Sequence, residues 1–256
     1  NSGTPEDGLI LIRDTLAQYK HPLITTHVNP DCDGIGSEMA LYGFLREQGR
    51  RASVMNCSPT PFFCKFLDTE EIIQEFRPDL PFPQDVDLIV ALDFGKWERM
   101  GPMTEAARKS GLPVLCIDHH PSEGPFGHPQ IINDSACATG EIIFDLVKSC
   151  DHTLSLPVAE SIYSAIMTDT GSFRFNNTNV RTHQIAGELL SVGVQPNVMY
   201  SNIYESTHPA RLHLLGLTLS ELKVSSDGLV GWIVVTQELL KKAGAQPQDT
   251  EDFVDF

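Results

Sequence analysis

Short apolar segments that alternate with helical stretches constrain the fold of this chain more than any other feature. The predicted strands cover residues 23–27, 52–56, 87–93 and 113–118. The predicted helices between them cover residues 34–47, 69–76 and 103–110. Apolar strands separated by helices form parallel sheets that are covered on both faces. We therefore predict an α/β protein with a doubly wound, mostly parallel sheet, whose ligands bind at the carboxyl edge of the strands.

The second half of the chain has a different pattern. Helical apolar spacing recurs at residues 139–149, 157–168, 180–192 and 197–222. A strand at 228–235 and a short helix capped by Thr236 follow. One strand and one helix cannot bury a core of their own. We therefore predict a first domain at 1–194, a helical connector at 195–224 and the beginning of a second α/β domain at 225–256.

Composition excludes several classes of protein. The chain has 34 acidic and 18 basic residues in 256, a net charge of −16, which argues against a protein that coats duplex nucleic acid. A short or single nucleotide is still compatible with this charge. No run approaches the roughly 18 apolar residues of a membrane span, and the polar, acidic start is not that of a signal peptide. The six cysteines form no metal-binding spacing, so we expect free, buried thiols and a cytoplasmic location.

Acidic and histidine side chains follow the predicted strands and one later helix. They are His27, Asp31, Asp33, Asp93, Asp118, His119, His120 and Asp169. In a doubly wound sheet the carboxyl ends of the strands meet at one edge. Carboxylate and imidazole groups are the ligands expected there for a hard or borderline divalent cation. Five carboxylates gathered at one edge would repel one another strongly unless cations lay among them.

Each of these elements has an alternative interpretation when it is taken alone. A single Asp at a strand end is most often a helix cap or a turn former. A single His is most often a surface residue or a hydrogen-bonded core residue. Gly34-Ile35-Gly36 lacks the third glycine of a dinucleotide-binding loop. It is the combination of strand ends that predicts a metal site.

These motifs resemble those of the DHH phosphoesterase family. The matching positions are His27-x-x-Pro30-Asp31-x-Asp33-x-x-Gly36-Ser37, Asp93, Asp118-His119-His120 and Asp169-Thr170-Gly171-Ser172-Phe173-Arg174. The resemblance spans residues 20–256 in the family's order. It is strongest to the nanoRNase and pAp-phosphatase branch, also called exopolyphosphatase-related, through Asn29-Pro30-Asp31, residues 165–177 and Glu251-Asp252-Phe253-Val254. The RecJ exonucleases share the core motifs but are larger.

The resemblance implies a centre with two Mn²⁺ ions, for which Mg²⁺, Co²⁺ or Fe²⁺ could substitute. His27, Asp31 and Asp93 would hold one ion. Asp33, Asp93, His119 and Asp169 would hold the other, so that Asp93 bridges the pair. Asp118 would orient its neighbours, and His120 would contact the phosphate or the leaving oxygen. Two such ions, about 3.5–4 Å apart, can activate a shared water and clamp the attacking and leaving oxygens.

Further residues near the motifs have open interpretations. Ser37 either caps the helix that follows it or contacts substrate. Arg174 either binds a phosphate oxygen with both arms of its guanidinium or forms a surface salt bridge. Residues 135–139 are interpreted as packing against the start of the helix at 139–149, with either Thr139 or Ser135 as its cap.

The resemblance implies a manganese-dependent phosphoesterase that hydrolyses short oligoribonucleotides, pAp, or both, by a metal-activated water. The alternatives are a cyclic- or linear-dinucleotide phosphodiesterase, an exopolyphosphatase or pyrophosphatase, and a nucleotide-sensing module without turnover. Residues 225–256 would begin the substrate-binding DHHA1 domain of the family. The expected partner is a short RNA, a mononucleotide or a dinucleotide, without stable duplex binding or membrane attachment. A homodimer and a monomer both remain open.

Overall fold

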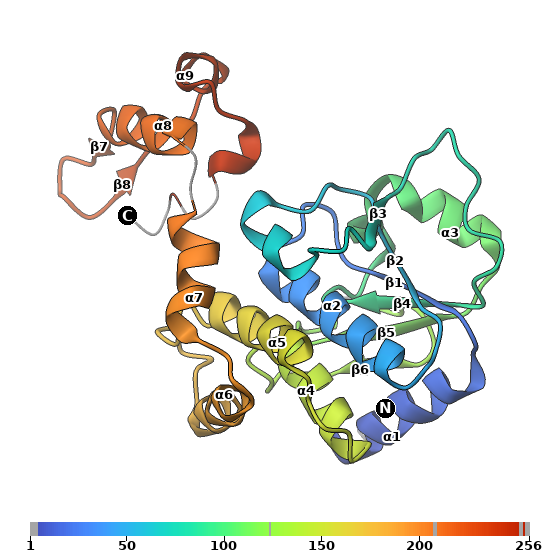
Figure 1. The fold of residues 1–256 in the computed structure, drawn as a ribbon. Helices are drawn as coiled ribbons and strands as arrows, with labels where there is room; N and C mark the ends of the chain where they lie inside the picture. The colour runs from blue at the N-terminus through green and yellow to red at the C-terminus, as the bar shows by residue number, and fades with distance from the viewer. Residues whose placement is uncertain (1–4, 123, 207–208, 251–252, 254–256) are drawn as a thin grey trace. The chain divides into compact units, whose positions relative to one another are not determined.

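The computed structural model describes residues 5–122, 124–206, 209–250 and 253 (Figure 1). The chain divides into two compact units, residues 1–200 and 201–256, and each is described by itself. Within the described residues, no helix is both long enough and apolar enough to cross a membrane.

A six-stranded sheet in which every neighbouring pair is parallel forms the centre of the first unit. Its strands are β1 (Pro22–Thr25), β2 (Ser53–Asn56), β3 (Ile73–Glu75), β4 (Leu88–Leu92), β5 (Val114–Asp118) and β6 (Gln130–Ile132). The strand order is β3-β2-β1-β4-β5-β6, so the winding direction reverses between β1 and β4. This order confirms the predicted doubly wound α/β fold, and its switch point is where ligands bind in such sheets.

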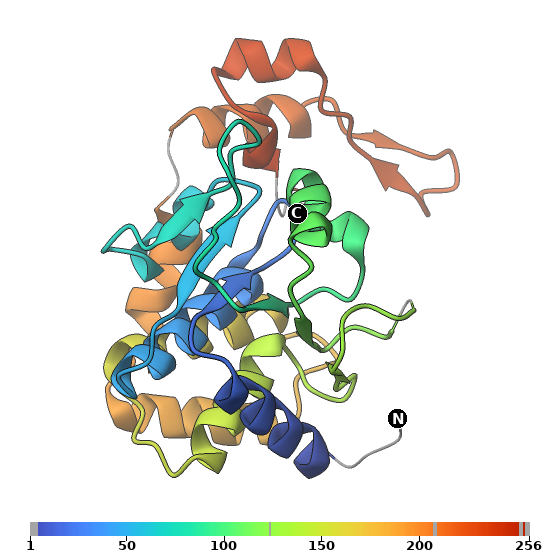
Figure 2. The ribbon, with the colours of Figure 1, turned by 90° about the vertical axis from the view of Figure 1, so that its right-hand side faces the viewer.

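Helices cover both faces of this sheet (Figures 1 and 2). One face packs against α2 (Cys32–Glu47) and α4 (Thr139–Ser149), with α5 (Leu156–Asp169) packed over them. The other face packs against the 3-10 helix η2 (Trp97–Met103) and α3 (Thr104–Ser110). Every residue of β1, β4 and β5 is buried, as expected for strands that are covered on both sides.

Small residues let α2, α4 and α5 approach one another closely. A Cβ atom on Gly36 would lie 2.5 Å from the Ser161 carbonyl oxygen, and one on Gly140 would lie 2.5 Å from the Ala165 Cβ. Neither glycine could carry a side chain without moving a neighbouring helix. These close contacts fix the relative positions of the three helices.

Most of the predicted elements are confirmed to within two residues, but the predicted helix at 69–76 is wrong. That segment is a turn followed by strand β3. The Asp68 carboxylate accepts hydrogen bonds from the backbone N–H groups of Ile72 and Ile73, at 2.7 and 3.0 Å, and β3 pairs with β2. Pairing along the sheet edge outweighs the local helical preference.

Other elements of the first unit had no sequence-based prediction. They include α1 (Pro5–Gln18) and the three-residue strand β6.

The predicted helical stretch at 197–222 is interrupted. Its parts are α7 (Pro196–Tyr200), the π-helical turn η3 (Ser201–Glu205) and α8 (Pro209–Leu219). Pro209 cannot donate a backbone hydrogen bond, which favours its place at the start of a helix.

The second unit has a small core of its own. Helix α8 packs against α9 (Gln237–Ala243), and the buried side chains include Leu214, Leu240 and Phe253. The unit therefore includes part of the predicted connector, and its boundary differs from the one predicted at 225. Thr236 caps α9 as predicted, since its hydroxyl accepts a hydrogen bond from the Leu239 N–H at 3.2 Å. The predicted strand at 228–235 is reduced to β8 (Gly231–Trp232), which pairs antiparallel with β7 (Lys223–Val224).

The cysteines depart from expectation at one pair. Cys32, the first residue of α2, is joined by a disulfide to Cys64 in the 3-10 helix η1 (Phe62–Leu67). The expectation of six free thiols is therefore wrong for these two, whose pairing depends on a tertiary contact between segments 32 residues apart. Cys57, Cys116, Cys137 and Cys150 are free.

The close packing of α2 on α5 gives a stability test. We expect Gly36→Ala to lower the free energy of unfolding by about 1–3 kcal/mol, because the new methyl group must displace the backbone of α5. Gly187→Ala is the matched control, since it lies on α6 (Val180–Val192) with no atom within 4 Å of the added Cβ. The control should be neutral or more stable by up to about 1 kcal/mol. Urea denaturation measures both, and equal stability of the two variants would contradict the packing argument.

Candidate metal centre

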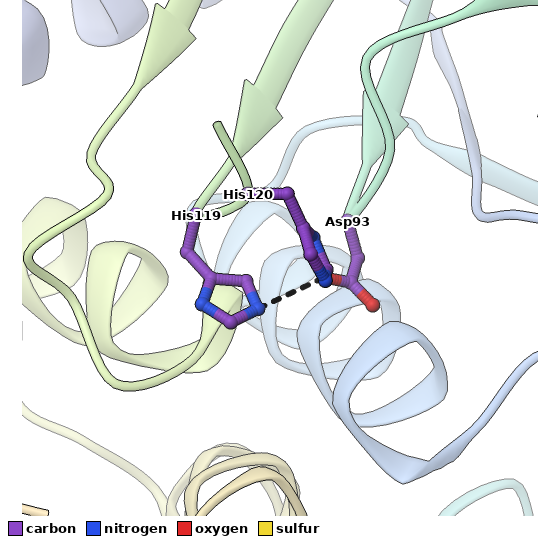
Figure 3. Close-up of side chains that lie close together, drawn as sticks. All are labelled: Asp93, His119 and His120. Carbon is purple, nitrogen blue, oxygen red and sulfur yellow. Dashed lines mark ion pairs between the residues drawn. The ribbon is translucent and has the colours of Figure 1, made fainter. Parts of the chain in front are cut away.

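The predicted site residues meet at the switch point of the sheet. His27 and Asp31 follow β1, Asp93 follows β4, and His119 follows β5. Figure 3 shows how the side chains of Asp93, His119 and His120 gather there. Asp93 has a left-handed backbone with φ of 67°, which costs a non-glycine residue roughly 1–3 kcal/mol. Such conformations persist where the surrounding structure holds them, and they concentrate at functional sites.

One group of donor atoms surrounds His27. The ring of His27 is bonded through Nδ1 to the Val28 carbonyl oxygen at 2.9 Å. Its Nε2 lies 3.4 Å from Asp93 Oδ2 and 3.8 Å from Asp31 Oδ2. A hydrogen bond from Nδ1–H to a carbonyl leaves the Nε2 lone pair available to a metal, which is the usual arrangement for ligating histidines.

A second group surrounds His119. Its Nε2 lies 3.6 Å from Asp93 Oδ1, 3.6 Å from Asp169 Oδ2 and 3.7 Å from Asp33 Oδ2. This nitrogen is buried and has no hydrogen-bond partner among the described residues. A buried ring nitrogen without such a partner, surrounded by three carboxylate oxygens, has the geometry expected of a metal ligand.

Asp93 belongs to both groups. Its Oδ2 lies near His27 and its Oδ1 lies near His119, so the two oxygens of one carboxylate face two different donor sets. The Thr139 hydroxyl donates a hydrogen bond to Oδ1 at 3.0 Å and holds the carboxylate in this orientation. This geometry supports the predicted bridging role of Asp93.

Two helix N-termini bind the other carboxylates. Asp31 caps α2, where its Oδ1 accepts the N–H groups of Asp33 and Gly34, each at 3.0 Å. Asp33 accepts the N–H of Thr139 at 2.7 Å and that of Gly140 at 2.9 Å, and thereby caps α4 from another part of the chain. The positive ends of both helices therefore face the carboxylate cluster and partly offset its charge.

Asp118 and His120 form a hydrogen-bonded pair beside these groups, and His120 Nδ1 also lies 3.6 Å from Asp93 Oδ1. Asp118 Oδ1 accepts hydrogen bonds from the His120 backbone N–H at 3.0 Å and from His120 Nδ1 at 2.8 Å. Asp118 is buried, whereas the His120 side chain is 53% exposed. Asp118 therefore holds the ring of the half-exposed His120, and its predicted role in orienting neighbouring residues stays a prediction.

The crowded carboxylates shift one another's proton affinity. Burial, followed by the charges of neighbouring carboxylates, raises the pKa of Asp33 and of Asp93 well above the ordinary value. Burial and the Asp31 charge raise the pKa of Asp169 to about 6. Burial and the neighbouring His120 lower the pKa of His119, while the hydrogen bond that the His120 ring donates to Asp118 raises the pKa of His120.

These features fit divalent cations. His27, Asp31 and Asp93 form one candidate group, Asp33, His119 and Asp169 form a second, and Asp93, His119 and His120 form a third, each with its ligand atoms within 4.8 Å of one another. Carboxylate and imidazole donors suit Mn²⁺ and Mg²⁺ better than metals that prefer thiolates. Cations would also relieve the carboxylate repulsion and engage the unpartnered Nε2 of His119.

The structure does not support the predicted roles of Ser37. It is fully buried inside α2, and its hydroxyl donates to Asp33 Oδ1 at 3.1 Å, so it holds a site carboxylate rather than substrate. It is not the helix cap either, because Asp31 occupies that position. Arg174 is exposed, with its Nε bonded to the Gly171 carbonyl at 2.7 Å, and its predicted phosphate contact stays a prediction.

Three residues near the site were missed or misassigned from the sequence. Thr139 is the first residue of α4 rather than its cap, which is Ala138, and Thr139 bonds Asp93 instead. Ser135 bonds Asn133 and caps no helix. Asn177 donates to the Asp169 carbonyl at 3.0 Å and holds the end of α5. No local pattern predicts these contacts, because each joins segments that are distant in sequence or lies in an irregular loop.

Fold and site together define a class, an α/β protein with a candidate divalent-metal centre at its switch point. Residues 22–168 match the model of the DHH family, N-terminal domain. A Thermus thermophilus relative, "Bifunctional oligoribonuclease and PAP phosphatase NrnA", is 33% identical over 95% of this chain and 71% of its own length. The Bacillus subtilis relative of the same name is 28% identical over 95% of this chain and 75% of its own length.

A solved structure agrees with this relationship. The exopolyphosphatase-related protein from Bacteroides fragilis superposes with a TM-score of 0.89 at 30% identity, over 98% of this chain and 76% of its own. The chain belongs to the DHH family. It is therefore a hydrolase that acts on phosphoester bonds.

The raised pKa of Asp169 predicts how the stability of metal-free protein depends on pH. The folded protein holds a proton on Asp169 up to about pH 6, whereas the unfolded chain loses it near 3.8. Stability should therefore fall as pH rises from about 4 to 6 and stay low above it. Asp169→Asn removes this dependence. The free energy of unfolding of the variant should therefore exceed that of wild type by up to about 3 kcal/mol at pH 7 and should equal it below pH 4.

Denaturation in EDTA at several pH values measures this difference. With saturating Mn²⁺ at pH 7, wild type should be more stable than Asp169→Asn, because wild type gains metal-binding energy that the variant lacks. An unchanged difference between pH 4 and pH 7 would contradict the electrostatic argument.

Proposed function

We propose that the protein hydrolyses short oligoribonucleotides and removes a phosphate from pAp, using two Mn²⁺ ions. The observation that carries the proposal is Asp93, whose two oxygens face two separate sets of histidine and aspartate donors. Two ions bound there would supply a nucleophile at neutral pH and neutralise charge on a phosphate. The names of the Thermus and Bacillus relatives support the substrate class.

The residues of the chain then have distinct roles. His27, Asp31 and Asp93 would hold one ion, and Asp33, Asp93, His119 and Asp169 the other. His120 is exposed toward the opening and is held by Asp118, so it can contact a phosphate or protonate the leaving oxygen. The hydrogen bond that His120 Nδ1 donates to Asp118 fixes the His120 ring and favours its protonated form.

Other parts of the proposal concern the whole protein. We propose that residues 225–256 begin a DHHA1 domain and that the protein is cytoplasmic. The match to 71–75% of the length of the relatives, extending through the second unit, supports the domain assignment. Substitution of Mn²⁺ by Mg²⁺, Co²⁺ or Fe²⁺ and assembly into a homodimer are further parts of the proposal.

A substrate panel tests the activity. We expect Mn²⁺-loaded protein to release mononucleotides from oligoribonucleotides of two to five residues and phosphate from pAp. Cyclic dinucleotides and polyphosphate complete the panel, and product release is followed by ion-exchange chromatography. Hydrolysis of polyphosphate alone would overturn the proposal in favour of an exopolyphosphatase. Binding of nucleotides without any hydrolysis would favour a sensing module.

Substitutions at the centre test the ligand assignment. Asp93→Ala should lose both ions, because one carboxylate serves both donor groups, and turnover should fall by at least about 10³-fold. His119→Ala should bind fewer metal ions per protein molecule than wild type. His120→Ala should keep both ions and lose about 10²–10⁴-fold in rate. Elemental analysis measures the metal, and two ions bound to Asp93→Ala would show that the assignment is incorrect.

A further inference from the structure

A small pocket adjoins the candidate metal centre and has a chemistry that the proposed roles do not use. It has a volume of about 220 Å³, and its lining includes Asp93, Asp118 and His120 together with Lys96 and Arg99. Pockets that enclose a whole drug-sized ligand are about 300–1,000 Å³. This one therefore suits a phosphate group and not an entire nucleotide.

Two basic side chains line this pocket. Lys96 is the extended residue that precedes η2, and Arg99 lies in the first turn of η2. The segment is kinked at Gly101, and Met100 and Met103 on either side of the kink are buried in the core.

Arg99 is held firmly through its backbone. Its carbonyl oxygen accepts a hydrogen bond from the Val28 N–H at 2.7 Å, directly after the predicted ligand His27. Thr104 also donates to the Trp97 carbonyl at 2.6 Å, which closes the other end of η2. The position of the Arg99 side chain is thereby tied to the strand end that carries part of the metal centre.

The guanidinium of Arg99 differs from those of the other described arginines because it has no hydrogen-bond, ion-pair or aromatic partner among the described residues. Each of the other nine contacts a carboxylate, a carbonyl oxygen or an aromatic ring. Arg99 is half-buried, and none of the described residues forms a hydrogen bond or an ion pair with its side chain. In a chain with 34 acidic residues, an unpaired arginine beside a cluster of carboxylates points to an anionic ligand.

We propose that Arg99 contacts the reacting phosphate of the substrate, as a catalytic residue in addition to His120. This inference rests on the proposed function. His120 and Arg99 line the same pocket, the Nδ1 of His120 bonds Asp118, and its Nε2 has no partner among the described residues. A phosphate in the pocket would accept hydrogen bonds from the Arg99 guanidinium and the His120 ring. Arginine in this role stabilises the charge that gathers on the phosphoryl oxygens in the transition state.

The test compares three substitutions. Arg99→Gln removes the charge and Arg99→Lys keeps it without the planar fork. Arg108→Gln is the matched control, because Arg108 is exposed and stacks on Trp97 with 4.8 Å to the ring centroid, outside the pocket. We expect Arg99→Gln to lower kcat by about 10²-fold or more on every substrate, with KM changed less. Arg99→Lys should recover part of the loss, and the control should match wild type.

Two measurements distinguish a catalytic role from a structural one. Metal content and thermal stability of Arg99→Gln should equal those of wild type. Calorimetric titration of the metal-loaded protein with inorganic phosphate should show at least about 10-fold weaker binding to Arg99→Gln. Wild-type kcat in Arg99→Gln would overturn the proposal, and so would loss of the metals. A rise in KM confined to substrates with a second phosphate would also overturn it, because Arg99 would then bind a phosphate that does not react.

The phosphate titration also separates this inference from the proposed function. If wild type hydrolyses no nucleotide substrate but binds phosphate in an Arg99-dependent way, the proposed function fails and the role of Arg99 as a phosphate ligand stands. If wild type hydrolyses oligoribonucleotides and Arg99→Gln changes neither turnover nor phosphate binding, the inference about Arg99 fails alone.

Discussion

Electrostatic repulsion among buried carboxylates is the constraint on which the rest of this structure depends. Asp33 and Asp93 are almost fully buried, and each has a carboxylate oxygen within 3.7 Å of His119 Nε2. Asp169 Oδ2 lies 3.6 Å from that same nitrogen. In water-poor surroundings such charges are tolerated only with protons, hydrogen-bond donors or cations beside them. The structure supplies the N-termini of α2 and α4 and the Thr139 hydroxyl as donors. Cations would complete the compensation.

This requirement links the packing of the helices to the chemistry of the site. Asp33 accepts N–H groups from α4 although it belongs to α2, so the two helix N-termini must lie side by side. Gly36 and Gly140 make that approach sterically possible. A larger residue at either position would move donors away from the carboxylates, and stability and metal affinity would change together.

The sequence predicted the fold well because it depends on local patterns, and the structure brings the predicted ligand residues together into candidate metal-binding groups. Apolar strands separated by helices imply a parallel sheet, and the Asp and His residues at strand ends must then share one edge. It was misleading where tertiary contacts outweigh local preference. The segment 69–76 became part of the sheet through pairing with β2, and Ser37 turned inward to Asp33 instead of capping a helix. The Cys32–Cys64 disulfide likewise required a contact that no local spacing reveals.

The sequence by itself determined which donor atoms are available, in which order, and at which strand ends, since these follow from residue identity and strand periodicity. Only the tertiary structure decided how those atoms are shared. It directs the two oxygens of Asp93 to different histidines, uses Asp33 to cap a distant helix, and places the Arg99 side chain at the pocket without a partner among the described residues. The reason is physical: these relationships depend on distances of a few ångströms between segments far apart in the chain, and only packing of the whole unit sets those distances.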